Sequence, residues 1–213
     1  MSRHVAKLLI GGVLVGASYV AHANIVTNPS FELPVISNNT FQLLASIPGW
    51  NTTSGVIEIQ SGPIGPAGAP LFGNQFVELD STGVSSRDIF QDLATISGVT
   101  YDLAFFFSPR PGQIAAENNI DVLAGGVSLL TIPPTAGTSV TAWSPFGASF
   151  IASSNTTRLS FQDLGPGNSL GSYIDNVSVV ARSVSGVPEP TTLLLLGLGL
   201  AGLGFARKRE KIN

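Results

Sequence analysis

The sequence predicts an all-β protein, a two-sheet antiparallel jelly-roll sandwich, preceded by an N-terminal signal helix and followed by a C-terminal single transmembrane helix. Three observations predict this fold class. Short apolar runs are separated by clusters of Gly, Pro, Asn and Ser. Apolar residues within the runs alternate with a period of two, and no stretch of residues 24–186 keeps a period near 3.6. The expected segments are a signal peptide at 1–23, the sandwich at 24–182, a linker at 183–190, a transmembrane helix at 191–206 and a basic tail at 207–213.

The first segment has the three parts of a secretory signal peptide. Basic residues precede Leu8, residues 8–20 are apolar, and small residues at 21–23 suit a cleavage site. The mature chain is therefore expected to begin at Asn24 and to be exported. A buried N-terminal helix is the alternative.

The strands are expected where apolar runs lie between turn residues. Tyr101, Leu103, Phe105 and Phe107 share one face of such a run, as the pleat of a strand requires. So many short strands in about 160 residues favour two packed sheets. The expected strands cover residues 55–60, 75–80, 87–93, 99–108, 118–124, 127–132, 145–152, 156–164 and 172–180.

The charge of the exported body restricts its chemistry. Residues 24–186 hold four arginines, no lysine and no histidine against eleven acids, a net charge of −7, and the whole chain lacks cysteine. Nucleic acid is not an expected partner, because phosphate binding needs clustered Lys and Arg. Ser-His-Asp, Cys-His, Schiff-base and His-ligated zinc sites are excluded by composition. Carboxylate catalysis on glycosidic bonds and Ca²⁺ binding by oxygens remain.

Two acids are candidate ligands of a metal ion. The alternation of residues 172–180 puts Asp175 on the face of Val177 and Val179, where an ionised carboxylate needs a partner. Glu32 lies near the other end of the body, and the two carboxylates can meet if the first and last strands are neighbours. With backbone carbonyls they would bind Ca²⁺ at about 2.3–2.6 Å per ligand. The alternatives are an arginine partner or two solvated surface acids.

Four side chains are candidates for binding a sugar. Trp50, Trp143, Tyr173 and Arg110 lie in or near expected loops, and sugar sites combine aromatic faces with planar polar groups. The two tryptophans also fit a core or strand-end role, because aromatic rings bury large areas. Arg110 could instead pair with an acid such as Asp80 or Asp121.

Six phrases of the body occur in an order that resembles the galactose-binding-like jelly-roll domains, and the DUF642-type group most closely. They are "NIVTNPSFELP", "IPGW", "FVELDS", "IFQDLATISGVTYDLAFFFSPRPG", "NNIDVLAGG" and "GSYIDNVSVV". The resemblance implies a β-sandwich with a carbohydrate-binding or adhesive role. Related carbohydrate-binding modules hold a structural Ca²⁺ with a Glu after the "SF" of the first strand and an Asp of the last. In this sequence these positions are Glu32 and Asp175.

The C-terminus combines three parts in order. Pro188, Glu189 and Pro190 precede the apolar residues 191–206, which would span about 24 Å as a helix. The basic residues that follow include Arg207, Lys208 and Arg209. They would keep this end in the cytoplasm.

The ensemble resembles the PEP-CTERM sorting signal of Gram-negative bacteria. The resemblance implies a transient single-pass stay in the inner membrane, processing by an exosortase-type enzyme, and delivery to the cell surface or the extracellular polysaccharide matrix.

Three functions follow from the sequence, in decreasing order of support. The first is a non-catalytic exported protein that binds polysaccharide. The second is a structural or adhesive matrix component without a defined sugar site. The third is a carboxylate glycosidase or lyase that uses a pair such as Glu78 and Asp80.

Overall fold

The computed structural model describes residues 23–53, 55–64, 69–81, 88–182, 197–198 and 200. The expected signal peptide, linker and basic tail, with most of the expected transmembrane helix, lie outside the described residues. Gly197, Leu198 and Leu200 are helical. Among the described residues, no helix is long and apolar enough to cross a membrane.

Two antiparallel sheets form the body, as the sequence predicts. The six-stranded sheet has the order β1 (Thr40–Leu44), β2 (Ile57–Ser61), β3 (Gln75–Glu78), β10 (Tyr173–Ala181), β5 (Thr100–Ser108) and β8 (Ser144–Ile151). The four-stranded sheet has the order β4 (Asp88–Ala94), β9 (Thr156–Asp163), β6 (Ile120–Ala124) and β7 (Val127–Ile132). One short 3₁₀ helix, η1 (Ala115–Glu117), precedes β6.

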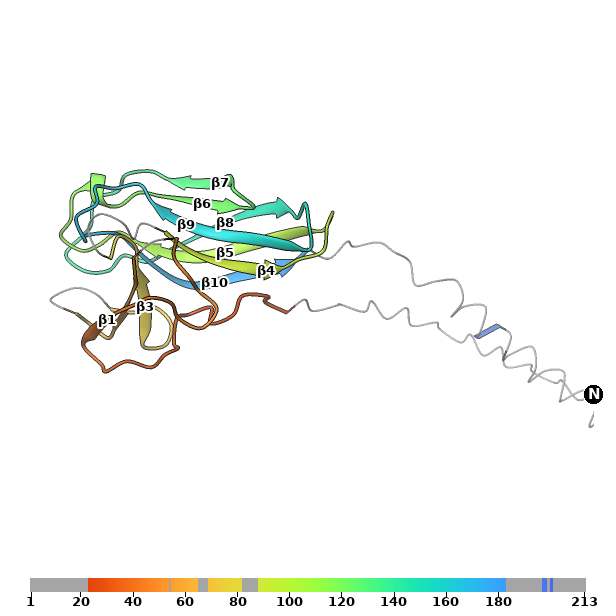
Figure 1. The fold of residues 1–213 in the computed structure, drawn as a ribbon, viewed down its shortest axis with the longest axis horizontal. Coiled ribbons are helices and arrows are strands. Elements are labelled where there is room, and N and C mark those ends of the chain that lie inside the picture. Colours follow the sequence, from red (N-terminus) through yellow and green to blue (C-terminus); the bar gives the residue numbers. More distant parts are fainter. Residues whose placement is uncertain are drawn as a thin grey trace, which may run out of the picture.

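The sheets stack face to face over part of their width. In Figure 1 the strands of the two sheets overlap across the body, while β1 and β3 lie below them and β3 runs at a steep angle to β5. The first and last parts of the body are neighbours, because the amide of Ile25 donates to the carbonyl of Val179. The two ends of the body are thus neighbours, which is the condition under which Glu32 and Asp175 can meet.

The core fills the space between the sheets. Tyr101, Leu103, Phe105 and Phe107 are all buried on one face of β5, which confirms their predicted alternation. The residues of the hydrophobic core, with the partly buried ones packed on it, run from Ile25 to Ala181. This segment therefore contains the apolar burial needed to fold on its own.

Trp50 lies in the middle of this core. Its ring is fully buried, its centroid lies 5.2 Å from that of Phe31 and 6.1 Å from that of Phe161, and its Nε1 donates to the carbonyl of Asn28. A fully buried ring cannot present a face to a ligand. The expectation that Trp50 binds sugar is therefore corrected in favour of its core role.

Two features of the sheets differ from the expected pattern. Strand β1 was not among the expected strands, and its residues Phe41 and Leu43 are exposed. In β10 the pairing with β5 shifts between Asp175 and Ser178, where Asn176 has a positive φ of 49°. Such a bulge adds one residue to the strand and reverses the alternation beyond it.

Candidate functional site

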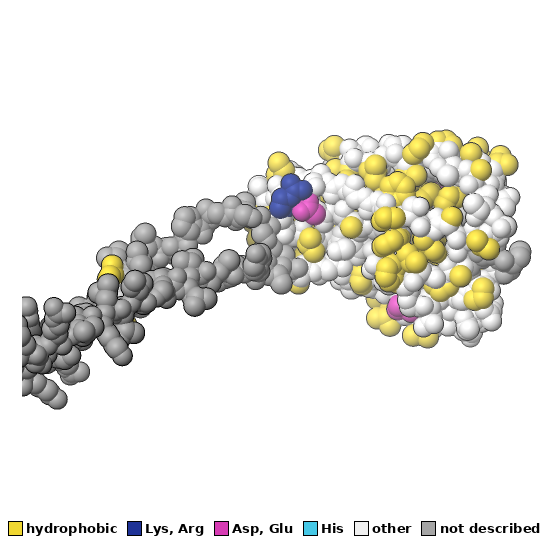
Figure 2. All heavy atoms as spheres, turned by 180° about the vertical axis from the view of Figure 1, so that it is seen from behind, with side chains coloured by type: hydrophobic (Ala, Val, Ile, Leu, Met, Phe, Trp, Pro, Cys, Tyr) yellow, Lys and Arg dark blue, Asp and Glu magenta, His cyan; other side chains and the backbone are white. Residues whose placement is uncertain are grey.

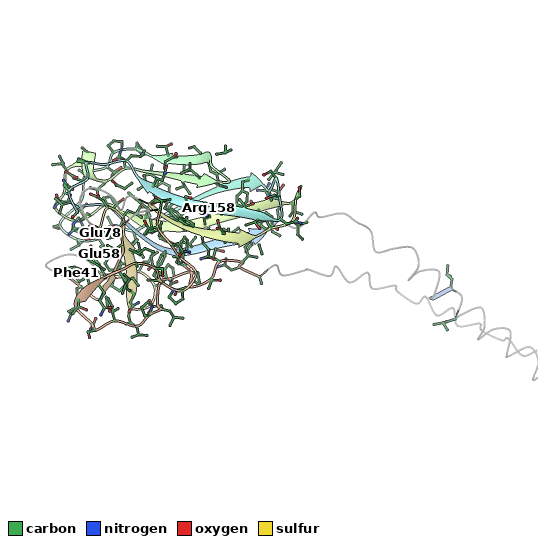
Figure 3. The ribbon with its side chains drawn as sticks, in the orientation of Figure 1. Phe41, Glu58, Glu78 and Arg158 are labelled. Atoms are coloured by element: carbon green, nitrogen blue, oxygen red, sulfur yellow. The ribbon has the colours of Figure 1, made fainter. Side chains whose placement is uncertain are left out.

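Two glutamates lie side by side on the outer face of the six-stranded sheet. On β2, Ile57 and Ile59 point into the core and Glu58 points outwards. On β3, Val77 points into the core and Glu78 points outwards. The register pairs Glu58 directly with Glu78, and Figure 3 shows the two residues next to each other. Both are nonetheless buried, at 7% and 1% exposure. Two like charges are therefore held together away from water.

One amide and one guanidinium hold this pair. The Nε2 of Gln60 donates to Oε1 of Glu58 at 2.9 Å and also to Oε2 of Glu78. Arg110 makes an ion pair with Oε1 of Glu78. Burial raises the pKa of Glu58, and the hydrogen bond from Gln60 and the charge of Arg110 oppose that rise. A single cation thus serves two carboxylates.

An aromatic group adjoins the glutamates. Tyr173 lies opposite Glu78, and the ring of Phe76 is 4.8 Å from that of Tyr173 and 5.8 Å from that of Trp143. The guanidinium of Arg110 lies 5.8 Å from the centre of the Tyr173 ring. Phe76 and Tyr173 are buried, and burial raises the pKa of Tyr173. Trp143 and Arg110 are the half-buried members, so they are the ones that reach solvent.

Arg110 is aimed at this group by its loop. Its backbone amide donates to Oδ1 of the fully buried Asn118 at 2.7 Å. Gly137 lies so close that a Cβ on it would stand 1.8 Å from the carbonyl oxygen of Arg110, and only glycine permits that approach. The backbone on both sides of Arg110 is therefore fixed before any side chain contact forms.

The structure corrects the expected partner of Arg110. The sequence offered an acid such as Asp80 or Asp121 as the partner, but the guanidinium reaches Glu78. Oδ2 of Asp80 accepts hydrogen bonds from the backbone of the 168–169 loop, and Asp121 accepts from hydroxyls of β7. Glu78 and Asp80 therefore belong to different hydrogen-bond networks.

Glu32 and Asp175 converge on one short segment before β3. Oε1 of Glu32 accepts hydrogen bonds from the amides of Asn74 and Gln75 at 2.8 and 2.9 Å. Oδ2 of Asp175 accepts from the amide of Phe72 at 3.0 Å. A Cβ on Gly73 would stand 2.2 Å from Oε1 of Glu32, so glycine is required between these contacts. The two predicted ligands are thus brought together from positions far apart in the sequence.

The environment of Asp175 differs from the one expected. The bulge in β10 puts Asp175 opposite Phe106 on the outer face, whereas Val179 pairs with Leu103 on the core face. The predicted shared face with Val177 and Val179 is wrong for this reason. Asp175 is fully buried all the same. Burial, with a smaller contribution from the charge of Glu32, raises its pKa to about 7.

This second pair offers oxygen ligands to a hard cation. Its hydrogen bonds described above all come from backbone amides, and the arginine ion pairs of the described residues lie elsewhere, at Glu78, Asp92 and Asp102. In the described ranges no three His, Cys, Asp or Glu residues gather where they could hold a metal. A cation here would therefore need backbone carbonyls or water in addition to Glu32 and Asp175.

Sequence reasoning identified five candidate site residues of these clusters and missed two polar ones. Arg110, Trp143 and Tyr173 do come together, and Glu32 and Asp175 meet as predicted. Glu58 and Gln60 were not singled out. Their signal is visible in "IEIQ", where each polar residue follows an isoleucine and so shares a face with the other.

Two segments of the chain match known families. Residues 24–180 match the family described as Protein of unknown function (DUF642), and residues 186–209 match the PEP-CTERM protein-sorting motif. The latter range includes Pro188, Glu189, Pro190 and the basic residues from Arg207 to Arg209. The motif indicates export with a C-terminal membrane-anchored sorting signal. No curated protein matches the chain.

Solved structures with a similar fold include two cyclase structures from Fischerella sp. TAU. The Stig cyclase Fisc is 17% identical, with a TM-score of 0.54 over 76% of this chain and 98% of its own. A second cyclase structure is 16% identical, with a TM-score of 0.55 over 78% and 100%. The CBM22-1 xylan-binding domain of Paenibacillus barcinonensis Xyn10C is 10% identical, with a TM-score of 0.47 over 79% and 100%. At these identities the two cyclase structures show the fold alone.

Proposed function

The chain belongs to the DUF642 family and carries a PEP-CTERM protein-sorting motif, and from that premise we propose that it is an exported, non-catalytic protein whose sandwich binds polysaccharide. The outer face of the six-stranded sheet is the binding surface. An exosortase-type enzyme processes the tail, and the mature protein acts at the cell surface or in the extracellular polysaccharide matrix.

The observation that carries this proposal is the group formed by Trp143, Arg110 and Tyr173. Buried rings of Phe76 and Tyr173 support the half-buried Trp143, and the Nε1 of Trp143 donates to the carbonyl of Ala69 at 2.9 Å. A tryptophan fixed in this way loses little side-chain entropy when a sugar ring stacks on it. Arg110 beside it supplies planar N–H donors for sugar hydroxyls.

The charge of the surface agrees with a neutral or weakly charged polymer as ligand. Figure 2 shows one face of the molecule with hydrophobic side chains near its middle and very few charged ones. Nucleic acid remains an unsuitable partner, because the exported body has only four arginines and no lysine.

A panel of soluble polysaccharides tests the proposal. Residues 24–182 are run in native gels containing each polymer, and retarded migration measures affinity. Trp143→Ala is expected to weaken binding at least about tenfold, since stacked aromatic residues dominate such contacts. Phe90→Ala is the matched control, because Phe90 is a half-buried aromatic on the other sheet. If the unaltered protein binds no polymer of a broad panel, the proposal is wrong.

We also propose that Ca²⁺ is a structural cofactor held by Glu32 and Asp175. The geometry is compatible: two buried or half-buried carboxylates meet, and backbone amides alone satisfy them in the described contacts. Bound Ca²⁺ would supply the positive charge that this pair lacks. It would fix the segment 72–75 that leads into β3 and its Glu78.

A carboxylate-based glycosidase or lyase is the second candidate, favoured by the contact of Glu58 and Glu78 through Gln60. A raised pKa at Glu58 is what a general acid requires. Release of reducing ends from a bound polymer, abolished by Glu58→Gln, would establish this activity in place of pure binding. Binding without any release would remove it.

A further inference from the structure

The four edge strands of the sandwich are protected to different degrees. An exposed edge offers unpaired backbone groups to another strand, and proteins commonly blunt such edges with charge, proline, bulges or a covering segment. In β4, Asp88 and Asp92 supply charge, and Asn51 bridges to Phe90 along the strand. Strand β8 contains Pro145, and the pairing of β7 has a register shift.

Among the residues that the structure describes, strand β1 shows none of these devices. It pairs with β2 in an unbroken register from Thr40 to Leu44, and it contains no proline and no charge. The whole stretch 33–57 lacks a charged residue, although the body has a net charge of −7. Among the described residues, the ladder of β1 is with β2 alone. Its other side is therefore a regular, uncharged edge.

The side chains of this edge are apolar and exposed. Phe41 is 53% exposed and Leu43 45%, and both lie on the outer face of the sheet, opposite Gln60 and Glu58. Leu33 and Val35, just before β1, are also exposed. Figure 3 shows Phe41 at the margin of the sheet, beyond the two glutamates.

We propose that β1 pairs with β1 of a second copy of this chain, antiparallel about Gln42, and joins the two six-stranded sheets into one. The sequence TFQLL is self-complementary in this register. Phe41 of each copy lies opposite Leu43 of the other, Thr40 lies opposite Leu44, and the two Gln42 amides face each other.

Charge favours a second copy over other occupants. Two bodies of net charge −7 repel each other over most of their surface, and the uncharged stretch 33–57 is where they can approach without like charges in contact. A basic partner would instead find no acid on β1 to bind. The paired sheets would carry two binding faces, which raises the avidity for a repeating polymer.

Substitution of Gln42 tests the register as well as the contact. Sedimentation velocity of residues 24–182 from about 1 to about 200 μM, the range of modest interfaces, is expected to show a reversible dimer. Gln42→Glu and Gln42→Lys each put like charges opposite one another and should weaken the dimer about fivefold, as cross-strand pairs do. An equimolar mixture of the two variants should regain the dimer as a heterodimer. Gln42 is exposed, so thermal melting should show both variants folded.

Ile151→Glu is the matched control, because Ile151 is exposed on the opposite edge strand of the same sheet. It should dimerise as the unaltered protein does. The proposal is overturned if the unaltered protein is monomeric throughout, or if either Gln42 variant dimerises normally. It is also overturned if the mixture gains nothing, or if Ile151→Glu is the variant that dissociates.

Discussion

Two carboxylate pairs lie at the outer side of the six-stranded sheet and are hydrogen-bonded in different ways. Glu58 and Glu78 receive an amide from Gln60 and a guanidinium from Arg110. Glu32 and Asp175 receive backbone amides from residues 72–75. Both pairs are largely withdrawn from water, so in each pair the two negative charges repel each other with little screening by solvent.

The two pairs differ in whether a positively charged side chain contacts them. The first pair carries its own cation, and that cation also contacts the aromatic residues of the proposed binding surface. The second pair has dipoles but no full positive charge among its described contacts, and the pKa of Asp175 is raised to about 7 as a result of burial and of Glu32. An external cation is therefore expected at the second pair and not at the first.

Removal of Arg110 should give the largest effect. Arg110→Gln leaves two buried glutamates without a cation, and breaking a buried ion pair costs about 3 kcal/mol. Urea unfolding of residues 24–182 measures the loss. Arg158→Gln is the matched control, since Arg158 pairs with Asp92 with 47% and 46% of their side chains exposed. Exposed pairs contribute about 0.5 kcal/mol, so equal losses in the two variants would contradict the comparison.

Calcium should give the next effect, and only through the second pair. Addition of Ca²⁺ to chelator-treated protein should raise the melting temperature by about 5 °C, since saturation at 100 times Kd contributes about 2.7 kcal/mol. Asp175→Asn should lose this response, whereas Glu78→Gln should keep it. If neither chelator nor Ca²⁺ changes the melting temperature, the proposed Ca²⁺ site at Glu32 and Asp175 is wrong.

The smallest effect should be a change of pH dependence at the first pair. Burial raises the pKa of Glu58 in the folded state above its ordinary value of 4.5. Ionisation therefore costs stability as pH rises through the folded pKa, and that cost is absent below the unfolded pKa. Glu58→Gln removes the cost. Its stability relative to the unaltered protein should rise as the pH increases above the ordinary pKa of 4.5, and a constant difference in thermal melts would refute the assignment.

The sequence predicted most of the fold because the core pattern is local. The alternation of β5 and β9 is visible in single runs, and all nine expected strands form with small shifts at their ends. Strand β1 was missed because its apolar run is short and interrupted by Gln42, and its pairing with β2 is visible only in the fold. The bulge at Asn176 was not predicted, because no residue pattern in the sequence marks the positive φ of this asparagine. Because of this bulge, Asp175 lies on the outer face and not on the face of Val179.

The site was only partly predictable, because it depends on strand order. Arg110 meets Glu78 since β3, β10 and β5 are neighbours, and no spacing within one strand reveals that order. Glu32 and Asp175 were singled out from the alternation of residues 172–180 and from their places near the two ends of the body, and the family resemblance implies the same two positions. Trp50 and Trp143 were indistinguishable by type, and only the fold assigns one to the core and the other to the outer face.

The two tryptophans of the chain allow the most direct test of the proposed binding surface. Fluorescence of residues 24–182 is titrated with a polysaccharide that the native-gel panel identifies. The spectrum of Trp50→Phe, which retains Trp143, should change on binding. The spectrum of Trp143→Phe, which retains the core tryptophan, should stay constant. A change in Trp143→Phe with none in Trp50→Phe would contradict a sugar-binding surface at Trp143.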